Sequence, residues 1–190
     1  MLAYLGATGS SELQAALAGM LVLTLVAYGV LIAIPFVPGV EIGVFLLVAL
    51  GAPVAPYVYL ATLAGLSASY LVGRFVPVSQ MCRLLGVIGL HRACAFMLRV
   101  DALDQDKRLA LIKDHTPAWI GPSLLRYRYL VIALGLNLPG NALIGGGGGI
   151  ALMAGLSRIF SPLATILTIA VAVTPVTLAV YAFGTGVLAP

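Results

Sequence analysis

Charged residues are scarce in this sequence. Only 16 of its 190 residues are charged: ten are Lys or Arg and six are Asp or Glu, together 8% of the chain. An ordinary soluble domain carries about 25%, because charge keeps its surface hydrated. Hydrophobic residues make up 62% of the chain. The composition therefore excludes a soluble globular protein, a disordered chain and a nucleic-acid binder, and it predicts an integral membrane protein.

The sequence also lacks the motifs of common enzymes and metal sites. It contains no GxSxG, no GxxxxGK(S/T) and no cluster of acids of the kind that holds magnesium. Its two cysteines, Cys82 and Cys94, form no CxxC, and His91 and His115 have no metal or triad spacing around them. We therefore expect no enzymatic activity, no catalytic residue, no bound metal and no cofactor.

The few charges are concentrated in one segment. Residues 74–128 hold nine of the ten basic and four of the six acidic residues, so the net charge of this segment is +5. Lys and Arg in short loops mark the cytoplasmic side of a membrane. We therefore expect residues 74–128 to be a basic cytoplasmic or interfacial segment of an inner- or plasma-membrane protein. Outside this segment only Glu12, Glu41 and Arg158 are charged, and we place Arg158 on the cytoplasmic side as well.

The rest of the chain forms apolar runs long enough to cross a bilayer. Each charge-free run exceeds the roughly 20 residues that a helix needs to cross about 30 Å of hydrocarbon. The polar residues Ser10 and Ser11, followed by Glu12, predict a helix start, because Ser is a favoured N-cap and an acid stabilises the first turn. The charge-free runs are 13–40, 42–73, 129–157 and 159–190.

A Pro-Gly break interrupts each half of the chain. The first half, 12–73, is broken near 35–43, and the second half, 129–190, is broken near 137–149. Proline removes a backbone donor and glycine permits positive φ. Broken backbone is not tolerated against lipid, so it must be buried in protein or line a wet cavity. The residues that form the two breaks are Pro35, Pro38, Gly39, Pro139 and Gly140.

These breaks predict the fold class. We expect residues 1–190 to form a single all-α polytopic membrane domain with two inverted-type halves. Each half would contain a Pro-Gly-broken re-entrant hairpin and a transmembrane helix, which is the pattern of inverted-repeat transporters. The alternative is two kinked but continuous helices. In the last helix, Thr174-Pro175 predicts a kink, with Thr174 helping to satisfy the freed backbone.

A few polar residues near the breaks are candidates for a substrate path. Glu41 is the one acid deep in an apolar run, where an ionised carboxylate costs several kcal/mol. It is expected either to line a central cavity and take up a proton, or to bond freed backbone groups. Asn137 and Asn141 bracket the second break and have the same two interpretations. The path predicted from these features consists of Glu41, Asn137, Asn141, Gly145, Gly146 and Gly147.

The run Gly145–Gly149 has two interpretations of its own. Its consecutive amides suit an anion nest, and its lack of side chains suits close packing of two backbones; we favour packing. Four basic residues are candidates for the membrane interface, where Tyr127, Tyr129 and Trp119 form an aromatic belt. These interfacial or headgroup residues are Arg74, Arg126, Arg128 and Arg158.

The chain resembles the DedA family, also called the SNARE-associated or VTT-domain proteins, of which it would be a divergent member. The likeness lies in residues 35–39 followed by Glu41, in Gly65 through Tyr70 to Gly73-Arg74, and in Leu138-Pro139-Gly140 before the glycine run. It covers roughly residues 30–185. The resemblance implies opposed re-entrant hairpins and a role in lipid scrambling or proton-coupled transport that supports membrane homeostasis.

Under this resemblance Glu41 matches an acid near the first re-entrant loop of the family. Two family features are absent: Leu66 stands where bacterial members carry an acid, and Leu136 and Ala142 stand where they carry arginines. Because that acid and those arginines are absent, we expect a protein that moves a lipid or small amphiphile across the bilayer rather than a proton-coupled transporter. The alternative is a non-transporting scaffold whose basic loop 74–128 docks a partner. Membrane lipids are the expected partners, a homo-oligomer is left open, and no nucleic acid is expected.

Overall fold

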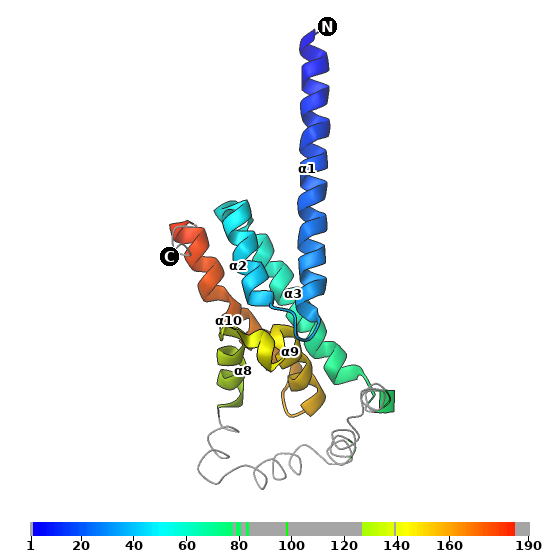
Figure 1. Ribbon diagram of the computed structural model, residues 1–190, viewed down its shortest axis with the longest axis vertical. Helices are drawn as coiled ribbons and strands as arrows, with labels where there is room; N and C mark the ends of the chain where they lie inside the picture. The colour runs from blue at the N-terminus through cyan, green and yellow to red at the C-terminus, as the bar shows by residue number, and fades with distance from the viewer. Residues whose placement is uncertain are drawn as a thin grey trace.

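The computed structural model describes residues 2–77, 79–80, 83, 98, 127–138 and 140–184, and every element in these ranges is helical. Figure 1 shows the arrangement of these elements. In chain order, the elements are α1 (Leu2–Ala33), α2 (Gly39–Leu50), the 3-10 turn η1 (Ala52–Val54), α3 (Ala55–Phe75), α8 (Arg128–Asn137), the 3-10 turn η2 (Asn141–Ile144), α9 (Gly146–Ser157) and α10 (Pro162–Phe183).

Three of the described helical segments are long and apolar enough to cross a membrane. They are Glu12–Ala33 within α1, Ala52–Phe75, and Pro162–Phe183. The other helices, α2, α8 and α9, have only 10 to 12 residues, or about 15–18 Å at 1.5 Å per residue. That is about half of the hydrocarbon thickness. The predicted all-helical chain with membrane-length helices is therefore confirmed at this level.

The first helix starts earlier than the sequence predicts. We expected it to begin at Ser10–Glu12, but α1 begins at Leu2 and runs through these positions. The prediction was wrong because a helix interior tolerates single Ser and Gly residues at a modest cost. No proline precedes Pro35, so nothing stops the helix before that point. Pro35 disfavours helical backbone at the residue before it, and α1 ends at Ala33.

At both predicted breaks one helix ends and another begins. The first break lies between Ala33 and Gly39, and the second between Asn137 and Gly146. Figure 1 shows the chain turning back at each of them, so that α2 runs against the direction of α1 and α9 runs against α8. The alternative of two kinked but continuous helices is therefore wrong. Pro139 and most of the basic segment 74–128 lie outside the residues whose placement is described; of that segment the structure describes 74–77, 79–80, 83, 98 and 127–128.

α3 lies at the centre of the molecule and packs against α1, α9 and α10. Its side chains Val58, Leu66 and Tyr70 are almost fully buried. Gly65 lies against the carbonyl of Gly29 on α1, and Gly73 against the carbonyl of Leu152 on α9. These contacts leave no room for a Cβ, as expected for a ridge of small residues between membrane helices.

Candidate functional site

The two breaks lie against each other. The backbone N–H of Phe36 in the first break donates to the carbonyl of Gly145 in the second, over 2.6 Å. The backbone N–H of Gly140 in the second break donates to Oε1 of Glu41, just after the first break, over 3.2 Å. Two segments about a hundred residues apart thus supply hydrogen-bond partners for each other. This contact satisfies part of the backbone that the breaks leave without helical partners.

Glu41 has a structural partner and an exposed side chain. It lies in the first turn of α2, where the helix dipole favours a negative charge. Its side chain is exposed, and its carboxylate accepts the N–H of Gly140. Glu41 is not among the residues that line the central cavity, although its neighbour Val40 is. Of the two interpretations of Glu41, the geometry matches the one in which the carboxylate bonds freed backbone.

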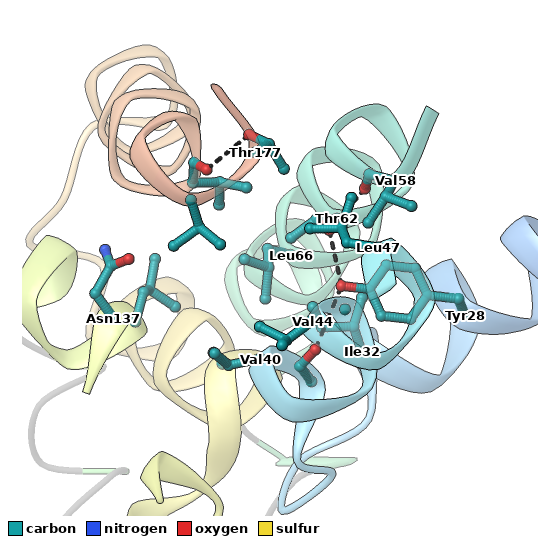
Figure 2. A pocket seen from close by; sticks show the side chains of 16 residues that line it. Tyr28, Ile32, Val40, Val44, Leu47, Val58, Thr62, Leu66, Asn137 and Thr177 are labelled. Atoms are coloured by element: carbon teal, nitrogen blue, oxygen red, sulfur yellow. Dashed lines mark hydrogen bonds between the residues drawn. The ribbon is translucent and has the colours of Figure 1, made fainter. Parts of the chain in front are cut away.

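A small cavity lies beside the joined breaks. Its volume is about 60 Å³, and residues from each of the six described α-helices line it. At 10–15 Å³ for each enclosed water, it holds roughly four to six waters and excludes a phospholipid headgroup. Figure 2 shows its polar side chains among a wall of aliphatic ones. These polar side chains are Tyr28, Thr62, Asn137 and Thr177.

Two hydroxyls on one side of the cavity bond to each other. The oxygens of Tyr28 and Thr62 lie 2.9 Å apart (Figure 2). Thr62 donates to the carbonyl of Val58 over 2.7 Å, which uses its one proton, so Tyr28 is the donor to Thr62. The Tyr28 oxygen also lies 3.3 Å from the carbonyl of Gly39 at the start of α2. Tyr28 thereby connects α1, α3 and the first break.

Asn137, on the other side of the cavity, links the second break to α10. Its Nδ2 donates to the carbonyls of Ala133 and Ala172, each over 2.9 Å. Ala172 precedes Pro175, which lies inside α10 and has no N–H to donate. Thr174 was predicted to satisfy freed backbone here; its hydroxyl bonds the carbonyl of Ala170 over 2.8 Å, one residue before the carbonyl of Val171 that Pro175 leaves without a helical donor. Side-chain donors thus gather around the proline, as they do in other broken membrane helices.

Asn141 lies apart from the cavity. It is fully buried, and its Nδ2 donates to the carbonyl of Leu136 over 3.1 Å, close to the end of α8. Its Oδ1 has no partner among the described residues. Asn141 is absent from the cavity lining. Its position fits the structural interpretation, in which the amide satisfies backbone at a helix break.

The glycine run packs against backbone. Gly145 and Gly146 have φ of 119° and 68°, a conformation that strains residues with a Cβ. Gly146 lies against the carbonyl of Val37, and Gly148 against the carbonyl of Ile32. The backbone of the first break therefore occupies the space that side chains would fill. This arrangement agrees with the packing interpretation, and of the run only Gly147 lines the cavity.

Three of the predicted interfacial arginines gather around the α9–α10 connection. Arg74, at the end of α3, donates to the carbonyl of Phe160 over 2.9 Å. Arg128, at the start of α8, lies 5.2 Å from the ring centre of Tyr129, which packs edge-on against Phe160. Arg158 ends α9 in a left-handed conformation. Arg126 lies outside the described residues. The ends of α3 and α9 and the start of α8 therefore lie close together.

Sequence reasoning missed the hydroxyls of the cavity. Tyr28, Thr62 and Thr177 are single polar residues inside apolar helices, and nothing in their spacing relates one to another. The one available signal was that each interrupts a membrane-length apolar run, where a polar group needs a partner. Among the described residues, no group of His, Cys, Asp or Glu is placed to hold a metal ion.

Comparison with known proteins gives no relative. No family model, no curated protein and no solved structure matches the chain. A functional proposal for this protein therefore rests on its residues and their geometry.

Proposed function

We propose that this chain is an integral membrane protein that moves a lipid or small amphiphile across the bilayer. The observation that carries the proposal is the direct contact between the two breaks, Phe36 with Gly145 and Gly140 with Glu41. Half-length helices that meet at broken ends, among three helices of membrane length, are the arrangement in which transporters build a site near the midplane.

Contacts at the ends of the helices support a re-entrant second hairpin. Tyr129, next to the start of α8, accepts the backbone N–H of Ser161, just after α9, over 3.2 Å. The hairpin of α8 and α9 therefore begins and ends near one place. Arg74 connects the basic end of α3 to the same connection through Phe160. If residues 74–128 are cytoplasmic, this hairpin enters from and returns to the cytoplasmic side.

The first hairpin opens in the other direction. α2 ends at Leu50 and α3 begins at Ala55, at the end of α3 that is remote from Arg74. The hairpin of α1 and α2 therefore enters from the non-cytoplasmic side, opposed to the second, and the two tips meet. The cavity of about 60 Å³ is too small for a headgroup, so this conformation is the closed one. Transport requires the contact between the breaks to open.

In this mechanism Glu41 holds the two breaks together through its bond to Gly140. Its charge strengthens the bond from the Gly140 N–H, because bonds to ionised groups are stronger than neutral ones. Protonation of Glu41, or competition by a cationic headgroup, weakens that bond and favours opening. Glu41→Gln keeps an acceptor oxygen but removes the charge, so it separates the role of the charge from the role of the hydrogen bond.

Reconstitution in liposomes tests the proposal. Purified full-length protein is placed in vesicles with fluorescent phospholipid, and leaflet exchange is followed by dithionite quenching. We expect exchange faster than in protein-free vesicles, and a rate changed several-fold by Glu41→Gln. Glu12→Gln is the matched control, since Glu12 is an exposed acid on α1 far along the helix from the break. Unchanged exchange with Glu41→Gln would remove Glu41 from the mechanism.

The scaffold alternative predicts a different result. The protein would cause no leaflet exchange with any lipid tested, and neutralising the basic residues of 74–128 would abolish capture of a partner protein from membranes. That pair of outcomes would overturn the transport proposal.

A further inference from the structure

A long groove lies outside the joined breaks, between α1 and α3. Its volume is about 1040 Å³, far larger than the central cavity, and apart from Ser69, Gln80 and the Tyr57 hydroxyl its lining carries no polar side chain. The α1 wall includes Val22, Val26 and Val30, spaced one helical turn apart. The facing wall includes Leu60, Ala64, Ala68 and Val72 of α3 with the same spacing, and Val76 just after its end.

One part of the groove, beyond the crossing of the two helices, exists because α3 extends past the end of α1. The two helices cross where Gly65 meets the carbonyl of Gly29, and α1 ends four residues later, at Ala33. α3 continues to Phe75, so the face that carries Ala68, Val72 and Val76 has no helix of α1 beside it. Figure 1 shows α3 continuing past the end of α1. Small residues, Ala64 and Ala68, make the groove deep beside the crossing.

The chemistry of the groove selects an apolar occupant. Both walls belong to helices long and apolar enough to cross a membrane, so in the proposed membrane protein the groove faces lipid. Along α3 the groove runs from Tyr57 to Val76, roughly 28 Å at 1.5 Å per residue, which matches the hydrocarbon depth of a bilayer. An unpaired headgroup in such a lining would lose its hydration without gaining partners. The groove therefore fits hydrocarbon chains and is unsuited to carrying headgroups.

The charge at one end of the groove selects the headgroup that lies outside it. The groove reaches Gln80, which lies between Arg74 and Arg83 in the sequence. Every charged residue between 42 and 100 is basic, and the exposed Arg83, three residues after Gln80, supplies positive charge near this end. Basic residues at the membrane surface attract anionic lipids. Toward its other end the groove is lined by Tyr57 and Val22 and has no charged residue.

We propose that the groove between α1 and α3 binds an acyl chain of an anionic phospholipid whose phosphate lies beside Gln80 at the basic end of α3. The chain packs on Ala64, Ala68 and Val72 and covers the face that α1 leaves open. This inference concerns binding of a resident lipid. It holds whether or not the protein moves lipid, and failure of the transport assay would leave it intact.

Photo-crosslinking of the full-length wild-type protein tests the location. The probe is phosphatidylglycerol with a diazirine near the middle of one acyl chain, in phosphatidylcholine vesicles that contain the protein. We expect crosslinked peptides to come mainly from 22–34 and 60–76. Crosslinks distributed equally over the exposed face of α10, where Val171 is 71% exposed, would show unselective contact with surrounding lipid and would overturn the proposal.

A filling variant tests the groove itself. Ala64→Leu with Ala68→Leu adds two larger side chains at exposed positions one turn apart. Native mass spectrometry then measures phosphatidylglycerol retained by the purified protein. We expect retention to fall about tenfold. In the control, Ala49→Leu with Ala182→Leu, the same change is made at two exposed alanines outside the groove, and retention stays at the wild-type value.

Two further outcomes are decisive. Arg83→Gln is expected to reduce the preference for phosphatidylglycerol over phosphatidylcholine several-fold while leaving total lipid retention near normal; an unchanged preference would overturn the assignment of the headgroup.

If the filling variant stays folded by size-exclusion chromatography but converts a dimer to a monomer and retains its lipid, the groove holds a second copy of the chain, and the lipid proposal is overturned.

Discussion

The two breaks have similar sequences but use different chemistry. In the first, Phe36 has a positive φ of 67° between Pro35 and Pro38, and its side chain is 70% exposed. In the second, the described residues with positive φ are Gly140, Gly145 and Gly146. A left-handed conformation costs a residue with a side chain roughly 1–2 kcal/mol, a strain that glycine avoids.

This difference follows from how the breaks contact each other. The carbonyls of Ile32 and Val37 in and beside the first break lie against Gly148 and Gly146. Two backbones approach this closely only if one of them lacks side chains. Prolines therefore restrict the backbone of the first break. Carbonyls in and beside this break pack against the glycines of the second break, which have no side chains in the way. The two halves are alike in pattern and complementary in contact.

The largest expected effect is at Gly148. Gly148→Ala places a Cβ against the backbone of Ile32 and Ala33, which cannot rotate away. We expect a loss of about 3 kcal/mol in unfolding free energy, the upper end of the range for overpacking. The measurement is thermal unfolding of the protein in detergent, followed by size-exclusion chromatography after heating.

Gly149 provides the adjacent control. A Cβ at Gly149 lies 3.6 Å from the side chain of Pro35, an ordinary contact, and Ala is the better helix former by about 1 kcal/mol. Gly149→Ala should therefore be neutral or slightly stabilising. Equal destabilisation by both substitutions would contradict the assigned contact between the breaks.

An effect of intermediate size on the unfolding free energy is expected at Gly140 and Phe36, the positions with left-handed backbone. Its sign differs between the two breaks. Gly140 has a φ of 73° and open space around it, so Gly140→Ala should cost about 1–2 kcal/mol through strain alone. Phe36→Gly removes the same kind of strain, and the larger entropy of the unfolded chain offsets part of the gain. We expect Phe36→Gly to be neutral or stabilising in the same unfolding assay. Destabilisation of similar size in both variants would show that the two positions are equivalent.

The smallest effect is expected at the side chains that tie each break to a neighbouring helix. Asn137→Leu removes the donor to Ala172, and Tyr28→Phe removes the donor to Thr62. Hydrogen bonds between membrane helices contribute about 0.6 kcal/mol on average. Each substitution should lower the unfolding free energy by about that amount, and the two losses should add, because the residues share no partner. A combined loss well above the sum would show that the breaks are coupled through the cavity.

Much of the fold was readable from local sequence. Proline and glycine positions predicted both breaks, because their effects on backbone donors and on φ do not depend on the rest of the fold. The apolar runs predicted the membrane-length helices. The start of α1 was predicted wrongly. Ser10 and Ser11 are plausible N-caps, but a serine caps a helix only where the helix begins, and α1 continues back to Leu2. The hydroxyl of Thr174 bonds the carbonyl of Ala170 in its own helix, whereas the carbonyl that Pro175 leaves without its helical donor is that of Val171.

The candidate site was less readable. Asn137 was singled out because it lies near a break, but its partner on α10 is 35 residues away along the chain. Tyr28 and Thr62 are 34 residues apart, and no local pattern relates them. Glu41 was expected either at a cavity or bonded to freed backbone, and only the structure shows that its carboxylate accepts the N–H of Gly140. The direction of a side chain at a break depends on which distant segment packs there, and the composition of the chain does not indicate that segment.

By itself, the sequence determined that this chain is helical and apolar, that it breaks twice, and that its charge gathers in one segment. These properties follow from the preferences of individual residues for lipid, for water and for backbone conformation. Only the tertiary structure decided that the two breaks bond to each other, that the glycine run receives the carbonyls of α1, and that α3 carries an uncovered groove. Those features depend on where helices cross and where one ends beside another, and the crossing is set by packing between residues far apart in the chain.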